Sequence, residues 1–198
     1  MKLTEDIPDI RKEISMANRL PGTTIELAPA DYNSTKETFK NLFLCGGLVL
    51  SQVSSLTDLE PYIVQNWVKR KFVSPPKRKQ YTMRQFCRIA IINMLRESMQ
   101  IERIATLLSY INGRLDDESD DLIDDSDLYF YYIDCISKID YPRSEEEVNK
   151  AVEEAVKDFK EPVAGAKKRL IKVLSVMTHA HFAAVLSRKA DEILNTLD

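Results

Sequence analysis

A cluster of basic residues in the middle of the chain is the clearest chemical feature of this sequence. Eight Lys and Arg residues and no acidic residue lie between positions 69 and 88, although the whole chain carries a formal net charge of −3. Lys and Arg neutralise nucleic-acid phosphates, and this contact supplies most of the sequence-independent binding energy. The cluster therefore predicts a nucleic-acid-binding surface. Its members are Lys69, Arg70, Lys71, Lys77, Arg78, Lys79, Arg84 and Arg88.

A polar helix face overlaps the start of this cluster. Pro61 suits the first turn of a helix that we expect to run to about Lys71 and to bury Val64, Trp67 and Phe72. Four polar residues at positions i, i+3, i+4 and i+7 share the opposite face. Gln and Asn can each make a bidentate contact to adenine, and Lys favours guanine or phosphate, although a plain solvated face is the alternative interpretation. The four residues are Tyr62, Gln65, Asn66 and Lys69.

The remaining basic residues follow a break in the helical pattern. Residues 74–76 read Ser-Pro-Pro, and residues 77–81 are long enough only for a tight hairpin. Thr82 and Gln85 then form a capping box that opens the next helix. We expect the hairpin to contact phosphates and the minor groove, which positions a protein without reading much sequence. The residues assigned to this contact are Lys77, Arg78 and Lys79, with Arg70 and Arg84 beside them.

The composition predicts a mostly α-helical protein with several segments. The 198 residues include only 5 Gly and 8 Pro, and 44% are hydrophobic. We expect an N-terminal arm or short helices at 1–47, a DNA-binding domain at 48–112, an acidic linker at 113–127 and a helical dimerisation or effector domain at 128–198. The acidic segment reads as a solvated linker, or alternatively as a phosphate mimic that shields the basic face. The aromatic residues 129–132 indicate a core or a dimer interface, with an effector pocket as the alternative.

Other classes of function find no support in the sequence. The three Cys are scattered, as is typical of a reducing compartment, and we expect a cytoplasmic protein without a membrane span. His179 and His181 lie at i and i+2 on a helix, so they cannot bind one metal together. No Gly-rich phosphate loop and no nucleophile–base pair stands out. We therefore expect neither an enzyme nor a bound metal or cofactor.

Residues 49–76, VLSQVSSLTDLEPYIVQNWVKRKFVSPP, resemble the opening of the mercury-resistance regulator (MerR) superfamily. The short helix, the turn, the Pro-led recognition helix and the apolar pair before the prolines have matching spacing. More narrowly, the chain resembles an uncharacterised bacterial family defined by a domain of unknown function. The resemblance implies a winged helix-turn-helix with a small β-hairpin wing, joined to a helical C-terminal domain. The departures are Asp58 in the turn, Tyr62 and Gln65 where arginines are usual, and apolar Ile63 and Val68 where polar residues are usual.

These features together predict a DNA-binding transcriptional regulator that binds double-stranded DNA as a homodimer, because two copies can read a palindromic site. An unknown small-molecule effector is a further possible partner. One alternative is a protein-interaction module that uses an exposed Ile63 and Val68. Another is an excisionase-like protein that shapes DNA.

Overall fold

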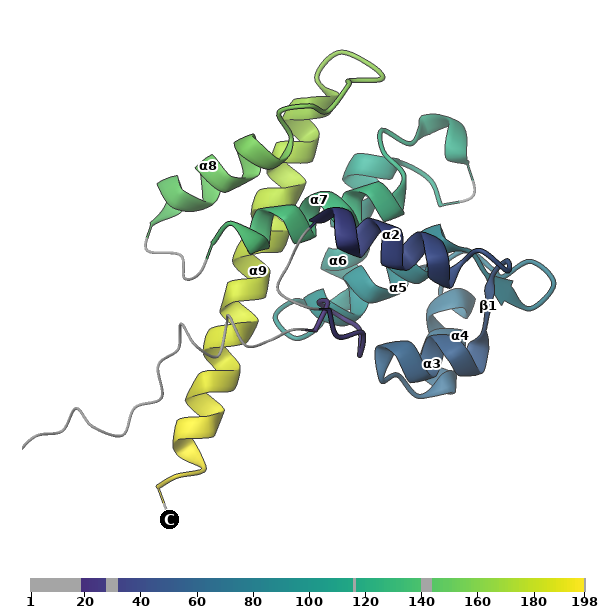
Figure 1. Ribbon diagram of the computed structural model, residues 1–198, viewed down its shortest axis with the longest axis horizontal. Helices are drawn as coiled ribbons and strands as arrows, with labels where there is room; N and C mark the ends of the chain where they lie inside the picture. The colour runs from purple at the N-terminus through teal and green to yellow at the C-terminus, as the bar shows by residue number, and fades with distance from the viewer. Residues whose placement is uncertain (1–18, 28–31, 116, 140–143, 198) are drawn as a thin grey trace, which may run out of the picture.

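The computed structural model describes residues 19–27, 32–115, 117–139 and 144–197, and it confirms a mostly helical fold with one small sheet (Figure 1). The sheet pairs β1 (Leu48–Val49) with β2 (Gln80–Tyr81) in antiparallel fashion. The helices are α2 (Tyr32–Leu42), α3 (Leu50–Thr57), α4 (Pro61–Lys69), α5 (Met83–Leu95), α6 (Ile101–Asn112), the short 3-10 helix η1 (Glu118–Asp120), α7 (Asp125–Ser137), α8 (Glu145–Ala155) and α9 (Ala166–Leu194).

Helices α3 and α4 are joined by a short turn at residues 58–60. Asp58 ends α3 in the left-handed conformation, with φ of 53°, and its N–H donates to the Ser54 carbonyl. Pro61 occupies the first turn of α4, where its missing N–H has no helical partner to lose. Val64 and Trp67 are buried, as predicted, so the opposite face of α4 is turned outward. The helix ends at Lys69, and Phe72, which we expected to be buried by it, lies beyond its end and is half-buried.

A hairpin follows α4 and returns the chain to the start of α3. The Gln80 N–H donates to the Lys77 carbonyl over 2.9 Å, and Leu48 pairs with Tyr81 across the sheet. The capping box predicted for α5 is present, because the Gln85 N–H donates to Thr82 Oγ1 and the Thr82 N–H donates to Gln85 Oε1. Residues 77–80 are called the wing below.

The core is continuous from α2 to α9, so the predicted boundaries near 47 and 127 do not separate independent cores. Phe39 of α2 is fully buried and its ring meets the Phe130 ring of α7 edge-on at 5.6 Å. Tyr129 donates to the Pro21 carbonyl, and the Thr24 N–H donates to Leu56. The described part of segment 1–47 is therefore packed on the body. It contains the short helix α2, one of the two possibilities expected for this segment. Residues 1–18 and 28–31 lie outside the described residues.

Helix α7 is an interior helix. Tyr129, Phe130 and Tyr132 are buried against α2, α5 and α9, so they serve the core and not a surface for a partner. The described part of the acidic segment is also structured, since it contains η1 and the N-terminus of α7. The prediction of a solvated linker is therefore corrected, because several of its carboxylates bind the half-buried Arg84 and the buried Arg88, as described below.

Helix α9 spans the molecule, and its C-terminal end extends away from α3 to α6 (Figure 1). Its length and a mean hydropathy of 1.4 over 18 residues satisfy the criteria for a membrane span, contrary to the expectation from sequence. Leu170, Val173, Leu174 and Met177 are fully buried among the other helices. Packing in the core thus accounts for part of the apolar character of this stretch, of which 44% is buried.

Candidate nucleic-acid interface

The exposed face of α4 presents the four polar side chains singled out from the sequence. Tyr62 is 66% exposed, and Gln65, Asn66 and Lys69 are also exposed. The buried Val64 and Trp67 fix the rotation of α4, because turning the helix would expose both apolar side chains to water. The resulting row of hydroxyl, amide and ammonium groups can meet the edges of base pairs.

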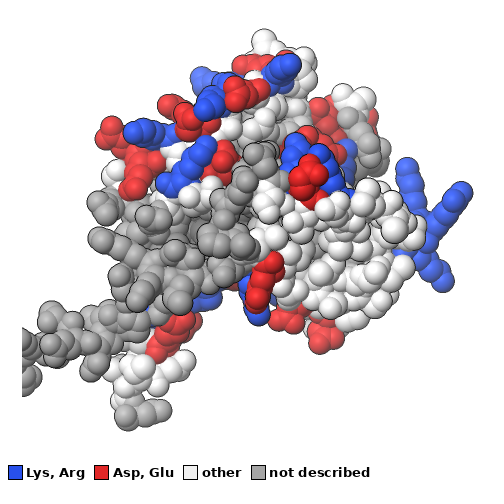
Figure 2. All heavy atoms as spheres, in the orientation of Figure 1, with Lys and Arg blue, Asp and Glu red and all other residues white. Residues whose placement is uncertain are grey.

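Three cations project from the wing beside this face. Lys77, Arg78 and Lys79 are exposed, and Lys and Arg side chains stand out from the wing at the right of Figure 2. Within the described residues these three side chains, like those of Lys69 and Lys71, have no carboxylate partner. They are therefore available to an external anion.

The backbone of the wing adopts an unfavourable conformation at its basic residues. Arg78 and Lys79 have φ of 51° and 63°, as at the centre of a type I′ turn, where Asn and Gly are favoured. Lys71, just after α4, has φ of 61°. A non-glycine residue with such a positive φ value destabilises the fold by about 1–2 kcal/mol. Backbone stability therefore does not explain why these positions carry Lys and Arg.

Arg70 lies at the edge of the face and is already engaged. Its guanidinium donates to Glu102 Oε1 of α6 over 2.6 Å and stacks over the Phe72 ring at 4.6 Å. The N–H of Glu102 itself and the Arg70 hydrogen bond lower the pKa of the Glu102 carboxyl. Arg70 therefore needs to exchange or share this partner in order to reach a phosphate.

Arg84 does not join the exposed cations. Its guanidinium hydrogen-bonds to Asp121 and lies 3.8 Å from Asp124 and 3.7 Å from Asp125. Burial raises the pKa of Asp121, and this effect outweighs the opposing hydrogen bond from Arg84. The assignment of Arg84 to the DNA contact is corrected, because carboxylates of the acidic segment occupy its side chain.

Arg88 is buried deeper and joins four parts of the chain. It donates to the Phe72 carbonyl over 2.7 Å and forms an ion pair with Asp125 over 3.0 Å. Asn112, at the end of α6, also donates to Asp125. We call Arg84, Arg88, Asn112, Asp121 and Asp125 the arginine clamp, since they join α5, α6, α7 and the turn that follows α4.

The sequence did not reveal Glu102, Asn112 and Asp125 as participants. Asp125 belongs to a run of acidic residues that is typical of a solvated segment. Its position at the N-terminus of α7 was the only feature that could have indicated its structural role. Ile63 and Val68, proposed as an exposed protein-binding pair, are half-buried and pack against the core. The protein-interaction alternative therefore loses its main support.

The candidate interface lies within a segment of the chain that matches a protein-family model. Residues 45–132 match the family model described as Domain of unknown function (DUF1836). The matched segment carries the candidate interface. It includes α4, the wing and the arginine clamp, and it agrees with the resemblance to a family defined by a domain of unknown function. Neither a curated protein nor a solved structure matched the chain.

Proposed function

We propose that the protein is a cytoplasmic transcriptional regulator that binds duplex DNA as a homodimer through a MerR-like winged helix-turn-helix. In this proposal α4 enters the major groove, and Tyr62, Gln65 and Asn66 meet base edges. Lys69 contacts guanine or phosphate. The wing contacts the backbone through Lys77, Arg78 and Lys79, and Arg70 contributes when it leaves Glu102.

The observation that carries the proposal is the division of the basic cluster into paired and unpaired cations. The acidic segment binds Arg84 and Arg88, which are inward, and Glu102 binds Arg70. Within the described residues, no carboxylate pairs with the other cations of the cluster, which are Lys69, Lys71, Lys77, Arg78 and Lys79. In a chain with a net charge of −3, uncompensated cations beside a polar helix face are the electrostatic pattern of nucleic-acid binding.

The backbone of the wing supports the same proposal. Three of the four described non-glycine residues with positive φ are basic, namely Lys71, Arg78 and Lys79. Strained residues persist where a function needs them. Presenting cations to a polyanion is such a function, since Asn-Gly would form this turn with less strain.

A stripe on α9 supports the dimer. Its members are exposed and follow the alternating spacing of three and four residues that a coiled coil requires. A second copy of α9 offers the same stripe, so a two-fold interface can bury both. The stripe consists of Val176, His179, Ala183, Leu186, Ala190 and Ile193.

The test is selection of bound duplexes from a random-sequence pool, followed by fluorescence anisotropy on the selected site and on mismatched sites. Gln65→Ala or Asn66→Ala should remove about 1–3 kcal/mol of discrimination at particular base pairs. Lys77→Ala with Lys79→Ala should weaken binding to all duplexes alike.

Lys150→Ala with Lys157→Ala is the matched control, because these exposed lysines lie on α8 and just after its end and the change removes the same charge. Failure of the pool to yield a bound duplex would contradict the proposal. A loss of discrimination from the wing variant alone would show that the roles of α4 and the wing are reversed.

A further inference from the structure

A second group of cations lies outside the matched family segment, at the start of α9. Four basic residues occur in the first two turns, and no acidic residue follows in α9 before Asp191. Lys168, Arg169 and Lys172 are exposed, whereas Lys167 Nζ donates to the Lys157 carbonyl. This concentration of positive charge has no role in the interface described above.

These cations oppose the helix that carries them. The N-terminus of a helix is its positive end, so basic residues there reduce helix stability and acidic residues increase it. Helix α8 follows this rule, with Glu145, Glu146 and Glu147 in its first turn. Helix α9 has the reverse pattern, which indicates that its basic residues serve contacts with something other than the helix itself.

Helix α6 connects these cations to the candidate interface. Arg70, at the end of α4, binds Glu102 in the first turn of α6, next to the exposed Arg103. Tyr110 is seven residues after Arg103 and therefore on the same face, about 10 Å further along the axis. Arg169 of α9 lies over the Tyr110 ring at 5.5 Å.

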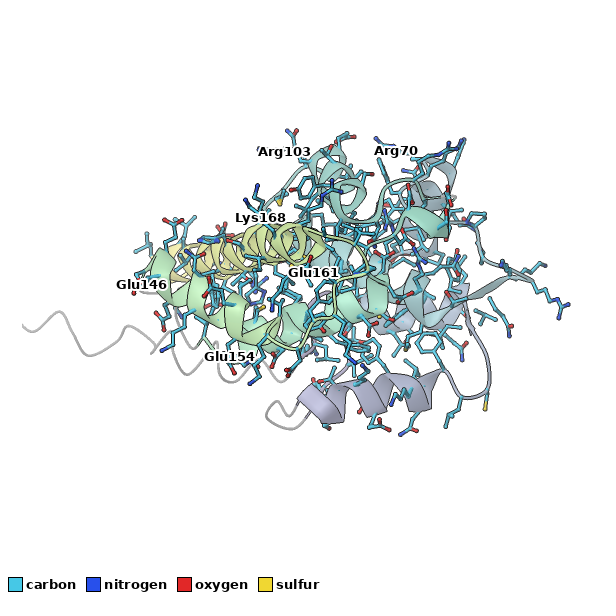
Figure 3. All side chains as sticks on the ribbon, turned by 90° about the horizontal axis from the view of Figure 1, so that it is seen from above. Arg70, Arg103, Glu146, Glu154, Glu161 and Lys168 are labelled. Carbon is cyan, nitrogen blue, oxygen red and sulfur yellow. The ribbon has the colours of Figure 1, made fainter. Side chains whose placement is uncertain are left out.

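The labelled side chains in Figure 3 show this separation of charge. Arg70 and Arg103 lie along the upper edge of the view, and Lys168 lies above α9. Glu146 and Glu154 belong to α8, lower and further to the left. Glu161 lies closer to α9, and its carboxylate accepts a hydrogen bond from the Gly165 N–H before that helix. We call Arg103, Lys168, Arg169 and Lys172 the basic ridge.

We infer that the basic ridge is an additional contact surface for the phosphate backbone of the same duplex that α4 binds. This inference rests on the proposed function. The ridge begins beside the Arg70–Glu102 pair and leads away from α4, so it meets DNA that flanks the base pairs read by α4. Tyr110 orients the Arg169 guanidinium by stacking, which reduces the side-chain entropy lost on binding.

The experiment compares the slope of log K against log salt for the full-length protein and for Lys168→Gln with Lys172→Gln. Two duplexes with the same central site are used, one of about 20 bp, which holds the two half-sites of a dimer, and one of about 40 bp, which adds flanking DNA. On the longer duplex the slope of the variant should be smaller by about 3.6, since two lysines are lost from each of two protomers and each lost phosphate contact removes about 0.9. On the shorter duplex the two proteins should have similar slopes.

Lys150→Gln on α8, with Lys157→Gln just after that helix, is the control, and its slope should equal that of the wild type on both duplexes. An unchanged slope for the ridge variant on the longer duplex would overturn the inference while leaving the proposed function intact. Equal losses in the ridge and control variants would also overturn it, because net charge and not position would then be responsible. A wild-type protein that binds neither duplex would remove the proposed function together with the ridge.

Discussion

The wing and helix α5 carry the same kind of side chain in opposite circumstances. Lys77, Arg78 and Lys79 are exposed on a strained turn, whereas Arg84 and Arg88 are held by carboxylates between helices. The two groups are neighbours in sequence and look alike there. Their difference shows that the basic residues paired with carboxylates must be separated from the unpaired ones before a basic cluster is interpreted as a binding surface.

The largest expected effect comes from breaking the arginine clamp. Asp125→Ala leaves Arg88 buried without its ion-pair partner and removes the acceptor of the Asn112 amide. We expect a loss of about 3–5 kcal/mol in the free energy of unfolding, because an uncompensated buried charge is costly. Urea denaturation measures it. Glu154→Ala, which removes an exposed pair with Lys157, is the control; a similar small change in both variants would show that the clamp is not a structural centre.

The two histidines of α9 also differ in burial, since His181 is largely buried and His179 is exposed. His181 contacts the Tyr132 hydroxyl at 2.8 Å, and burial, followed by the nearby charge of Arg188, lowers its pKa to about 4. As the pH falls, His181 takes up a proton near pH 6.5 in the unfolded chain but only near pH 4 in the folded chain. The free energy of unfolding is therefore unaffected by His181 above pH 6.5, and it decreases as the pH falls from 6.5 toward 4.

The loss attributable to His181 should approach about 3 kcal/mol at pH 4, and it is measured by urea denaturation at several pH values. His181→Gln should reduce the acid sensitivity of the protein. His179→Gln should retain it, because His179 is exposed. Identical pH profiles for the wild type and His181→Gln would contradict this assignment.

Relaxing the wing should improve stability and impair binding. Replacing Arg78 and Lys79 by Asn and Gly suits their positive φ values and should stabilise the protein by about 1–2 kcal/mol. The same change removes two cations, so DNA affinity should fall at every sequence. Thermal unfolding and anisotropy measure the two effects. A variant that is more stable and binds DNA as well as the wild type would show that the wing is a structural turn only.

The smallest effect should come from the edge of the interface. Glu102→Gln weakens the hold on Arg70 and removes a negative charge near the proposed phosphates. We expect DNA affinity to rise by a few-fold with little change in stability, because both side chains are exposed. Anisotropy at low salt measures the rise, and Glu97→Gln, which changes another exposed ion pair, is the control. Reduced affinity would indicate that Glu102 positions Arg70 for binding.

Local signals in the sequence predicted local structure well. Pro61 located the start of α4, the Thr82–Gln85 pair located the start of α5, and the spacing of Val64 and Trp67 fixed the exposed face. Residues 77–81 also formed a hairpin. Each of these features depends on interactions within a few residues, which a sequence pattern records directly.

Long-range pairing was not predictable in this way. Asp121 and Asp125 are 37 residues from Arg84 and Arg88, and only the packing of α7 on α5 brings them together. The run of acidic residues therefore looked like a solvated linker. Phe39 likewise lies in the core through contacts with α5 and α7, which nothing in its neighbouring sequence indicates.

The salt dependence of duplex binding tests the central claim most directly. The wild-type protein and Lys77→Ala with Lys79→Ala are titrated with one selected duplex at increasing salt concentrations. If the wing cations contact phosphates, log K should fall steeply with log salt for the wild type. The variant slope should be smaller by about 3.6, because two lysines are lost from each of the two protomers and each contact contributes about 0.9. A wild-type affinity that does not change with salt, or equal slopes for the two proteins, would contradict the account.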